Sequence, residues 1–499
     1  MMTMANLTER LKPRDAWGDS TLELRGVHYD SRKIEPGWAF FALRGENVDG
    51  HEYIGQAVEN GATLVVMQEQ RQLPEGVAGM VVENSRQALA YAAAVANGNP
   101  TLDIPVVGVT GTNGKTTITY LVEALMREVG RYPAVLGTIN YRFGEEIHPS
   151  LHTTPEAPEL LGTLADFRTR GCDAMVMEVS SHALAQYRID GVDFNVAVFT
   201  NLTPEHLDFH HDMESYFDSK ARLFDELLVT RTGHAVINID DPYGQRLAAK
   251  TPGAITYGSS EDAAVYPVEV QLGLNGIVGT LTTPTGTVAL SSPLVGKFNL
   301  SNLMAAVATG IALGFSPTLI TAGLLRANQV PGRMESIEND REALVLVDYA
   351  HTGDALEKVV GACRELHPRR LITVFGCGGD RDRSKRSVMG QVAAAQSDLV
   401  VVTSDNPRTE DAGRIIEDIL PGLHEHFDSA WTQDEARSAE GRGYCVIPDR
   451  RKAIRFAVSL LKKDDLLLVA GKGHEDYQII GTERKHFDDR EELRQALAG

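Results

Sequence analysis

The chain has 499 residues, of which 43% are hydrophobic and 23% are charged, and its formal net charge is −20. This length exceeds what a single hydrophobic core supports, and we expect about two to four domains. The negative charge argues against nucleic acid as a partner, because phosphate backbones would be repelled. It does not exclude small anionic substrates, because a local cluster of Arg and Lys sets the field inside a cleft.

We expect neither a membrane span nor a secretory signal. No apolar run approaches the roughly 18 residues of a spanning helix, and the N-terminal stretch MMTMANLTERLKPRD has no apolar core. The sequence has four cysteines without CxxC spacing, namely Cys172, Cys363, Cys377 and Cys445. This usage predicts a reduced compartment, the cytoplasm, with neither a disulfide framework nor a structural zinc site.

The first block of the chain is predicted to end at residue 101. It contains the short apolar runs ATLVVM, from Ala62, and GMVVE, from Gly79, followed by the helix-compatible stretch RQALAYAAAVAN. The turn-forming segment GNPTLD then provides a linker.

The second block, residues 102–332, alternates apolar strands with helix-compatible segments. The strands are predicted at IPVVGV, AMVMEV, NVAVFT and AVINID. Near-continuous apolar strands of this kind are typical of a mostly parallel sheet covered by helices. From about Ile255 to Val295, a stretch rich in Thr, Val and Gly predicts a few antiparallel strands beside that sheet. The segment NLSNLMAAVATGIALG predicts a helix that ends at Gly314.

The third block, residues 333–499, repeats the alternation with LVLVDY, LITVF, DLVVVTSDN and LLLVAGKG. Each run ends in a polar or glycine-rich loop. In open α/β sheets ligands bind outside the carboxyl ends of the strands, so we expect the chemistry in these loops.

A glycine-rich loop with a lysine, GTNGKTT from Gly111, lies between the first strand of the second block and the following helix. This arrangement directs backbone N–H groups toward phosphates, while the lysine side chain reaches the β- and γ-phosphates of a nucleotide. The first glycine of the general phosphate-loop pattern is misplaced, because Val109 occupies its position and Gly108 comes one residue too early. The alternative is a glycine-rich turn with a surface lysine. The predicted phosphate-binding residues are Gly111, Thr112, Asn113, Gly114, Lys115, Thr116 and Thr117.

Together with this loop, a series of motifs resembles the Mur ligase family, which includes folylpolyglutamate synthases. In order these are EVSSH, FTNLTPEHLDFH, YFDSKARLF, NLSNLMAA, PGRME, DYAHT, FGCGGDRD, SDNPRTE and GKGHEDYQ. The last motifs, with DSR at Asp30, are similar to members that add diaminopimelate. The resemblance implies three domains: an N-terminal UDP-MurNAc-binding α/β domain, a central P-loop ATPase domain with a mostly parallel sheet and a small antiparallel sheet, and a C-terminal Rossmann-like domain that binds the amino acid.

The activity implied by the resemblance is ATP-dependent amide-bond formation in peptidoglycan synthesis. The substrates would be ATP, UDP-MurNAc-L-Ala-D-Glu and meso-diaminopimelate, joined through an acyl phosphate with release of ADP and phosphate. Because two anions must be brought together, Mg²⁺ and cationic side chains are needed. We expect the chain to act as a monomer.

For the metal, the resemblance implies Thr116, Glu178, His206 and Lys220, with Lys220 modified by CO₂ to a carbamate. Lys115, Glu178, His206 and Lys220 are thus the expected catalytic residues. The modification needs a neutral amine and hence a lowered pKa. The alternatives are a solvated strand-end glutamate, a surface histidine and a solvated helix lysine. His210 and His211 are expected to be structural or exposed.

For the nucleotide, the resemblance implies that Asn302 contacts adenine, Arg333 approaches the phosphates and Asp348 holds the ribose. One departure is Gly353, where the family usually has proline after DYAHT. For the UDP-muramoyl dipeptide, the matching residues are Ser31, Thr153, Thr154, Ser180, Gln186 and Arg188. The segment from Arg44 to Glu46 is expected to line the uridine pocket.

The resemblance places the diaminopimelate pocket at Arg381, Asp405, Asn406, Pro407, Arg408, Gly471 and Glu475. An arginine such as Arg408 grips the distal carboxylate of this substrate, and a carboxylate such as Glu475 holds its ammonium group. Lysine lacks that carboxylate and would leave Arg408 unpaired, at a cost of about 1–3 kcal/mol or more. The alternatives kept open are a lysine-adding relative, a folylpolyglutamate synthase and a non-catalytic nucleotide-binding regulator.

Overall fold

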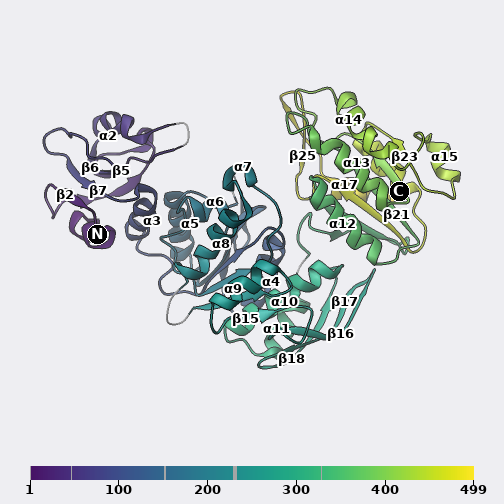
Figure 1. Cartoon of the computed structure of the whole chain (residues 1–499), viewed down its shortest axis with the longest axis horizontal. Helices are drawn as coiled ribbons and strands as arrows, with labels where there is room; N and C mark the ends of the chain where they lie inside the picture. The colour runs from purple at the N-terminus through teal and green to yellow at the C-terminus, as the bar shows by residue number, and fades with distance from the viewer. Residues whose placement is uncertain (1, 46–47, 151–152, 229–232, 328) are drawn as a thin grey trace. The chain divides into compact units, whose positions relative to one another are not determined.

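The computed structural model describes residues 2–45, 48–150, 153–228, 233–327 and 329–499 (Figure 1). The chain folds as two compact units, each of which is described by itself. One unit comprises Met1–Tyr266, Thr282–Val288 and Leu303–Gly323, and the other comprises Pro267–Leu281, Ala289–Asn302 and Leu324–Gly499. The domain boundaries expected after residues 101 and 332 stay predictions.

The N-terminal part of the first unit is built on a five-stranded sheet with the order β2-β7-β6-β5-β4. Only β2 runs antiparallel to its neighbour. The strands are β2 (Asp15–Trp17), β4 (Gly26–His28), β5 (Trp38–Phe41), β6 (Ala62–Met67) and β7 (Ala78–Val81). The remaining elements are α1 (Met4–Leu11), α2 (Ile54–Glu59), α3 (Ser85–Ala96), the 3₁₀ helices η1 (Ser31–Lys33) and η2 (Gly50–Tyr53), and the pair β1 (Met2–Thr3) and β3 (Glu23–Leu24). The apolar runs from Ala62 and Gly79 thus form β6 and most of β7, and the helix expected in the alanine-rich stretch is confirmed.

The rest of the first unit is built on an eight-stranded sheet with the order β11-β10-β9-β12-β8-β13-β14-β15. The strands are β8 (Val106–Thr110), β9 (Pro133–Leu136), β10 (Asn140–Phe143), β11 (Glu146–Pro149), β12 (Ala174–Glu178), β13 (Val196–Phe199), β14 (His234–Asn238) and β15 (Ile255–Tyr257). The helices are α4 (Lys115–Glu128), α5 (Ala157–Thr169), α6 (Ser181–Ala185), α7 (Leu207–His210), α8 (Met213–Asp225) and α9 (Pro242–Lys250). Six of these strands are parallel, and the hairpin β10–β11 forms an antiparallel edge.

Strand β8 lies at the point where the strand order reverses, because the chain adds β12 on one side and β13 on the other. Loops that leave the carboxyl ends of strands at such a switch point form the ligand crevice of open α/β sheets. The phosphate loop follows β8 directly, so the fold places it where this rule expects a ligand.

One expectation for the stretch after Ile255 turns out differently. The strand at its start, β15, pairs in parallel with β14 and belongs to the main sheet rather than to an antiparallel group. A separate three-stranded sheet follows, with β16 (Tyr266–Gly273), β17 (Gly276–Thr283) and β18 (Gly286–Ser292). The connections between them are two residues long, which only antiparallel neighbours allow. Then come α10 (Lys297–Ala312) and α11 (Pro317–Leu325), and Gly314 has the left-handed φ of +80° expected after a helix.

The C-terminal part is built on a six-stranded sheet with the order β19-β20-β24-β21-β22-β23, in which only β19 is antiparallel. The strands are β19 (Glu335–Ser336), β20 (Leu344–Asp348), β21 (Arg370–Phe375), β22 (Leu399–Val402), β23 (Gly443–Val446) and β24 (Asp465–Ala470), with a separate hairpin of β25 (Tyr477–Ile480) and β26 (Glu483–His486). The helices are α12 (Gly353–Glu365), α13 (Ser384–Gln396), α14 (Ala412–His424), α15 (Gln433–Ser438), α16 (Arg450–Ser459) and α17 (Asp489–Ala498).

Helices cover both faces of this sheet. On β20, Leu344 and Leu346 join an apolar cluster with residues of α12, α13 and α14. Val345 and Val347 point to the opposite face and join a cluster with residues of α16 and α17. This alternation is why the strand reads as a continuous apolar run. The expected Rossmann-like sheet is therefore present.

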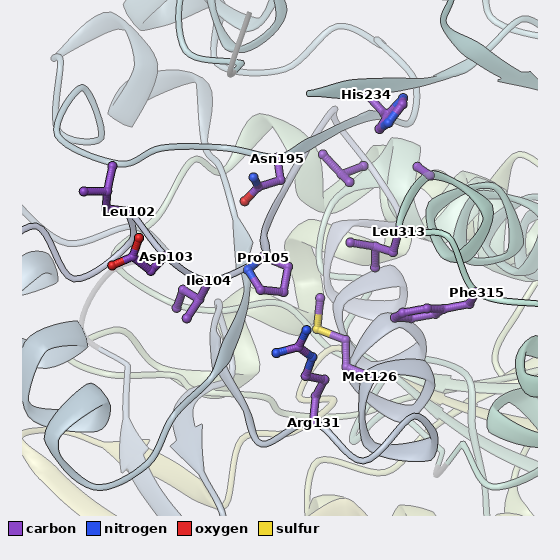
Figure 2. Close-up of a pocket in the computed structure, with 12 residues that line it drawn as sticks. Leu102, Asp103, Ile104, Pro105, Met126, Arg131, Asn195, His234, Leu313 and Phe315 are labelled. Atoms are coloured by element: carbon purple, nitrogen blue, oxygen red, sulfur yellow. The ribbon is translucent and has the colours of Figure 1, made fainter. Parts of the chain in front are cut away.

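A cavity of about 390 Å³ lies at the amino ends of β8, β13 and β14, at the edge of the sheet opposite the phosphate loop (Figure 2). Ile104, Pro105 and His234 lie in its wall, together with Met126 and Arg131 at the end of α4. This cavity therefore does not lie at the carboxyl ends of the strands, where the chemistry is expected. No helix of the described residues is both long and apolar enough to cross a membrane.

Candidate active site

The phosphate loop needs glycine at its first position. Gly111 has φ of +140°, and a Cβ atom added there would lie 1.9 Å from Thr200 Oγ1. Gly114 caps α4 with φ of +89°, which is also left-handed. Both glycines expected to shape the loop therefore adopt backbone that other residues rarely adopt.

The segment after β13 holds the phosphate loop in place. The backbone N–H of Thr112 donates to the Asn201 carbonyl at 2.9 Å, and that of Asn113 donates to Asn201 Oδ1 at 2.9 Å. Thr200 Oγ1 in turn donates to the Asn113 carbonyl at 2.7 Å. Thr200 and Asn201 were not singled out from the sequence, although both stand in the motif FTNLTPEHLDFH and follow the carboxyl end of a strand.

Two lysine amines meet at one carbonyl oxygen of the loop. Lys115 Nζ donates to the Gly111 and Thr112 carbonyls at 2.9 and 2.8 Å, and Lys220 Nζ donates to the Gly111 carbonyl at 2.9 Å. Lys220 comes from α8 and is only 1% exposed. Burial and the neighbouring Lys115 hold the pKa of Lys220 well below its ordinary value. Lys220 is therefore no solvated helix lysine, and its amine has the tendency to be neutral that carbamate formation requires.

Glu178 is buried at the end of β12 and has hydroxyl and amide partners. Thr116 Oγ1 donates to Glu178 Oε1 at 2.9 Å. Thr138 donates its N–H to Oε1 at 2.8 Å and its hydroxyl to Oε2 at 2.9 Å. With 1% exposure, Glu178 is not a solvated strand-end residue. Thr138 was missed by sequence reasoning, and its only signal was a polar residue just beyond the carboxyl end of β9.

His206 is much more exposed than Lys220 and Glu178. Its side chain is 45% exposed, and its ring is 4.8 Å from that of His182 and 6.4 Å from that of Tyr216. The Tyr216 ring lies 4.7 Å from Lys220 Nζ, and its hydroxyl lies 3.2 Å from Thr112 Oγ1. Tyr216 therefore lies between the histidine and the phosphate loop.

The neighbouring histidines behave as expected. His210 is buried with its Nε2 2.9 Å from Ser181 Oγ, and His211 is exposed. Burial, assisted by His182 and Lys220, lowers the pKa of His210 to about 4. His210 is therefore a neutral structural residue.

The expected metal residues supply hard oxygen donors. The Thr116 hydroxyl and the Glu178 carboxylate are in contact, and oxygen donors of this kind suit Mg²⁺. Among the residues that the structure describes, no three His, Cys, Asp or Glu side chains gather into a metal-holding group. The expected set relies instead on a hydroxyl and on a modified lysine.

Most residues expected to bind the muramoyl dipeptide meet at the carboxyl end of β12. Thr154 Oγ1 donates to the Glu178 carbonyl at 2.9 Å and accepts from Ser180 N at 3.2 Å. Arg188 donates to the Thr154 carbonyl at 3.0 Å and to Gln186 Oε1 at 2.6 Å. Thr153 and Ser180 complete the group: Thr153 Oγ1 lies 3.1 Å from Thr138 Oγ1, and Ser180 also caps α6, as the alternative interpretation of its motif predicts.

Ser31 belongs to a different part of the same unit. It begins the 3₁₀ helix η1, and its hydroxyl donates to Gln56 Oε1 at 2.7 Å. Of the segment expected to line the uridine pocket, Arg44 forms an ion pair with Glu69, whereas Glu46 lies outside the described residues.

The nucleotide residues of the second unit surround the end of β20. Asp348 is buried and accepts the N–H groups of Met334 and Ala350, each at 2.8 Å. Burial raises the pKa of Asp348, and Arg333 opposes that effect. The Arg333 guanidinium lies 4.9 Å from the centre of the Tyr349 ring.

Asn302 and Gly353 are two further residues of this unit that the sequence singles out. Asn302 does not lie at the N-terminus of a helix but inside α10, where its amide donates to Asn299 Oδ1 at 3.0 Å. Gly353 is the first residue of α12, capped by Thr352, which is a position where proline would also fit. The replacement of proline by Gly353 therefore leaves the helix start intact.

The residues expected to bind diaminopimelate converge beyond β22 and β24. Asn406 Nδ2 donates to Glu475 Oε2 at 3.0 Å. Arg408 has φ of +53°, and its guanidinium donates to the Gly379 carbonyl at 2.8 Å. A Cβ atom added to Gly378 would lie 3.0 Å from Arg408 Nη1 and 3.9 Å from Arg381 Cγ, so both arginines flank that glycine.

Backbone contacts fix the two other residues of this set. Pro407 accepts the N–H of Glu410 through its carbonyl at 3.2 Å, and Gly471 donates its N–H to the Asp348 carbonyl at 3.0 Å. The second contact joins the amino-acid loop to the nucleotide residue.

A buried lysine that sequence reasoning missed lies behind this pocket. Lys472 is 0% exposed and donates to Asn406 Oδ1 at 3.0 Å and to the Tyr477 carbonyl at 2.8 Å. It also lies 3.1 Å from Asp405 Oδ1. Its only sequence signal was its place between two glycines in GKGHEDYQ, because the hairpin that folds back over it is not visible as a pattern.

Comparison with known proteins agrees with this geometry. The model of the Mur ligase family catalytic domain matches residues 23–105, that of the Mur ligase middle domain matches 109–310, and that of the Mur ligase glutamate ligase domain matches 332–473. A UDP-N-acetylmuramoyl-L-alanyl-D-glutamate–2,6-diaminopimelate ligase from Geobacter metallireducens is 52% identical, covering 99% of this chain and 98% of the relative. The enzyme of the same name from Geobacter sulfurreducens is 50% identical, covering 98% of each chain.

A solved structure of an enzyme with the same name superimposes with a TM-score of 0.75 at 33% identity, covering 100% of this chain and 99% of the other. The matches follow the order of the domain models along the chain and extend over nearly its whole length. The chain belongs to the Mur ligase family.

Proposed function

We propose that the chain is an ATP-dependent ligase that joins meso-diaminopimelate to the D-Glu carboxylate of UDP-MurNAc-L-Ala-D-Glu. The observation that carries this proposal is the presence of opposite charges in the amino-acid pocket, where the positive charge of Arg408 acts on Glu475 and Asn406 donates a hydrogen bond to Glu475. A guanidinium and a carboxylate together complement an end group that carries both a carboxylate and an ammonium. The printed names of the full-length relatives support the same substrate.

The phosphate loop supplies the nucleotide side of the reaction. Lys115 lies over the Gly111 and Thr112 carbonyls, where its ammonium offsets phosphate charge. Thr116 and Glu178 would hold Mg²⁺, which when bound supplies charge stabilisation for ATP and for the approaching substrate carboxylate. In the second unit, Arg333, Asp348 and Asn302 are proposed to bind the nucleotide.

Lys220 is proposed to react with CO₂. Its neutral amine forms a C–N bond with the carbon of CO₂ and gives up a proton to solvent, which leaves a carbamate anion. This reaction gives Lys220 an anionic oxygen ligand beside the phosphate loop. The support for this step is the burial of Lys220 and the lowered pKa of its amine.

The amide bond then forms in two steps. The D-Glu carboxylate attacks the γ-phosphate of ATP and becomes an acyl phosphate, with ADP as the leaving group. The amine of diaminopimelate attacks the acyl carbon and expels phosphate. Thr153, Thr154, Ser180, Gln186 and Arg188, with Ser31, are proposed to bind the muramoyl dipeptide.

We further propose that the enzyme acts in the cytoplasm. All four cysteines are free and buried, as expected in a reduced compartment. We also propose the N-terminal domain to span 1–101, the ATP-binding domain 102–332 and the amino-acid-binding domain 333–499.

A phosphate-release assay tests the proposal. The purified chain is incubated with ATP, Mg²⁺ and UDP-MurNAc-L-Ala-D-Glu, and we expect phosphate only after meso-diaminopimelate is added. Release with L-lysine alone would identify a lysine-adding enzyme. Release with a folate acceptor and glutamate would identify a folylpolyglutamate synthase, and no release with any acceptor would favour a nucleotide-binding regulator.

A further inference from the structure

Lys472 is a buried charged residue whose contacts are with other residues of the amino-acid pocket and its hairpin. Its Nζ donates to Asn406 Oδ1 at 3.0 Å and to the Tyr477 carbonyl at 2.8 Å, and it forms an ion pair with Asp405 Oδ1 at 3.1 Å. Since the side chain is fully buried, Lys472 acts on a bound amino acid through its charge and through the residues that it holds.

Charges of both signs surround this pocket. Asp405 and Glu475 are the carboxylates, and Lys472 and Arg408 are the cations that act on them. Arg450 also acts on Asp405, but it is closed in a buried pair with Asp489 at 2.6 Å and adds no net charge. Arg381 adds a further positive charge beside Arg408.

Of the two carboxylates, Asp405 is the closer ionic partner of Lys472. It lies 3.1 Å from the Asp405 carboxylate and 4.0 Å from that of Glu475. Burial alone would raise the pKa of Asp405, yet Lys472 and Arg450 hold it below its ordinary value. Arg408, Arg381 and Glu475 are then the charges available to a ligand.

We propose that Lys472 determines specificity by cancelling the charge of Asp405, so that the pocket favours an amino acid whose distal end is zwitterionic over one whose distal end is only cationic. The inference rests on the proposed function of this pocket. Loss of Lys472 makes the pocket more negative by one charge, which favours the ammonium of L-lysine and disfavours the distal carboxylate of meso-diaminopimelate. A purely structural role would weaken both amino acids alike.

Competition between the two amino acids measures this effect directly. Enzyme, ATP and UDP-MurNAc-L-Ala-D-Glu are mixed with meso-diaminopimelate and L-lysine together, and the product ratio from mass spectrometry gives the ratio of their kcat/KM values. In K472M, which keeps the length of the stem and removes the charge, we expect this ratio to shift toward lysine by about tenfold or more. An equal loss for both amino acids, with an unchanged ratio, would overturn the proposal.

A matched pair of variants keeps the test valid even where K472M fails to fold. D405N and the double variant D405N/K472M both lack the buried carboxylate, and they differ only in the charge at position 472. We expect the double variant, whose pocket has one positive charge fewer than that of D405N, to accept lysine about tenfold more readily relative to diaminopimelate than D405N does. Equal ratios in the two variants would contradict the proposal.

The wild-type enzyme separates this inference from the proposed function. If it forms no diaminopimelate product, the proposed function fails, and the inference fails with it. If it forms that product but the variants keep its ratio, only the role of Lys472 is refuted. The KM for ATP should stay within about twofold in every variant, because the Lys472 side chain donates to Asn406 and to the Tyr477 carbonyl, which belong to the amino-acid pocket and its hairpin.

Discussion

At the residue scale, Lys220 has an unusual environment for a lysine. Burial removes its amine from water, and the charged group that acts on it most strongly is a second lysine, Lys115. Both amines donate to the Gly111 carbonyl. Two ammonium groups at one oxygen repel each other, so the site favours loss of a proton from the more deeply buried amine.

Replacing Lys220 with alanine tests this environment. We expect Lys220→Ala to lower kcat by about 10²-fold or more, because a preorganised charge near the transferred phosphoryl group is lost. Formate or acetate should restore part of the activity by occupying the vacated space as an anion. Phosphate release measured against acid concentration gives the result.

The exposed Lys250 on α9 provides the control for this prediction. Lys250→Ala should keep its activity and should not respond to the acids. A folded Lys220→Ala enzyme that no carboxylic acid activates would argue against the carbamate.

Glu178 and Lys220 could be proposed as site residues from the sequence, because both stand in motifs of the family resemblance, one at a strand end and one in a helix. Thr138, Asn201 and Lys472 were not found. Each acts through a partner far along the chain, such as Glu178 for Thr138 and Asp405 for Lys472. A spacing pattern contains no information on such pairs, because they arise only when loops from separate strands meet at the same edge of a sheet.

At the element scale, the phosphate loop is held between α4 and the segment after β13. Its backbone conformation and its closeness to Thr200 both depend on Gly111. The loop is therefore a part of the tertiary structure rather than a local turn, which explains why the misplaced first glycine of the motif does not prevent its formation.

Gly111→Ala should affect both the left-handed backbone of the loop and its close contact with Thr200. The added Cβ would lie 1.9 Å from Thr200 Oγ1, so the loop must shift, and we expect the KM for ATP to rise by about tenfold or more. The left-handed backbone adds about 1–2 kcal/mol of strain, which should lower the melting temperature. Steady-state kinetics and thermal unfolding measure the two effects.

Gly130 offers a matched comparison, because it also has a left-handed φ, +79°, but no atom within 4 Å of an added Cβ. Gly130→Ala should therefore show the loss of stability without the change in KM. An unchanged KM in Gly111→Ala, or an equal change in both variants, would contradict the importance of the contact with Thr200.

The long buried strands of both parallel sheets were predictable, because they are continuous apolar runs bounded by polar loops. The hairpin β10–β11 and the edge strand β15 were not. The residues of β11 are exposed and have no apolar alternation. Strand β15 has three residues, and a stretch that short looks the same whether it pairs in parallel or in a hairpin.

At the scale of the whole molecule, stability should depend on pH through histidines that are buried without charge. The His474 ring packs against the Tyr349 ring with 4.9 Å between their centres, and burial together with Arg333 lowers the pKa of His474 to about 4. The unfolded chain takes up a proton near pH 6.5, before the folded protein does. This contribution to stability is therefore complete above that pH and is lost progressively as the pH falls toward 4.

His474→Phe should reduce that dependence, because the phenyl ring keeps the contact with Tyr349 and does not titrate. Melting temperatures measured from pH 7 down to pH 4.5 should fall less steeply for the variant than for the wild type. His426→Phe, at an exposed position, controls for the added ring. Parallel curves for His474→Phe and wild type would show that His474 does not contribute.

The buried pair of Asp405 and Lys472 also limits how this pocket can evolve. Each residue is the ionic partner of the other, and loss of one alone leaves a buried charge uncompensated at about 3–5 kcal/mol, comparable with much of the stability of a typical domain. A lineage that changes one residue at a time must pass through that unstable form. Enzymes that add a different amino acid are therefore expected to differ at both positions, or to have exchanged the whole loop in a single event.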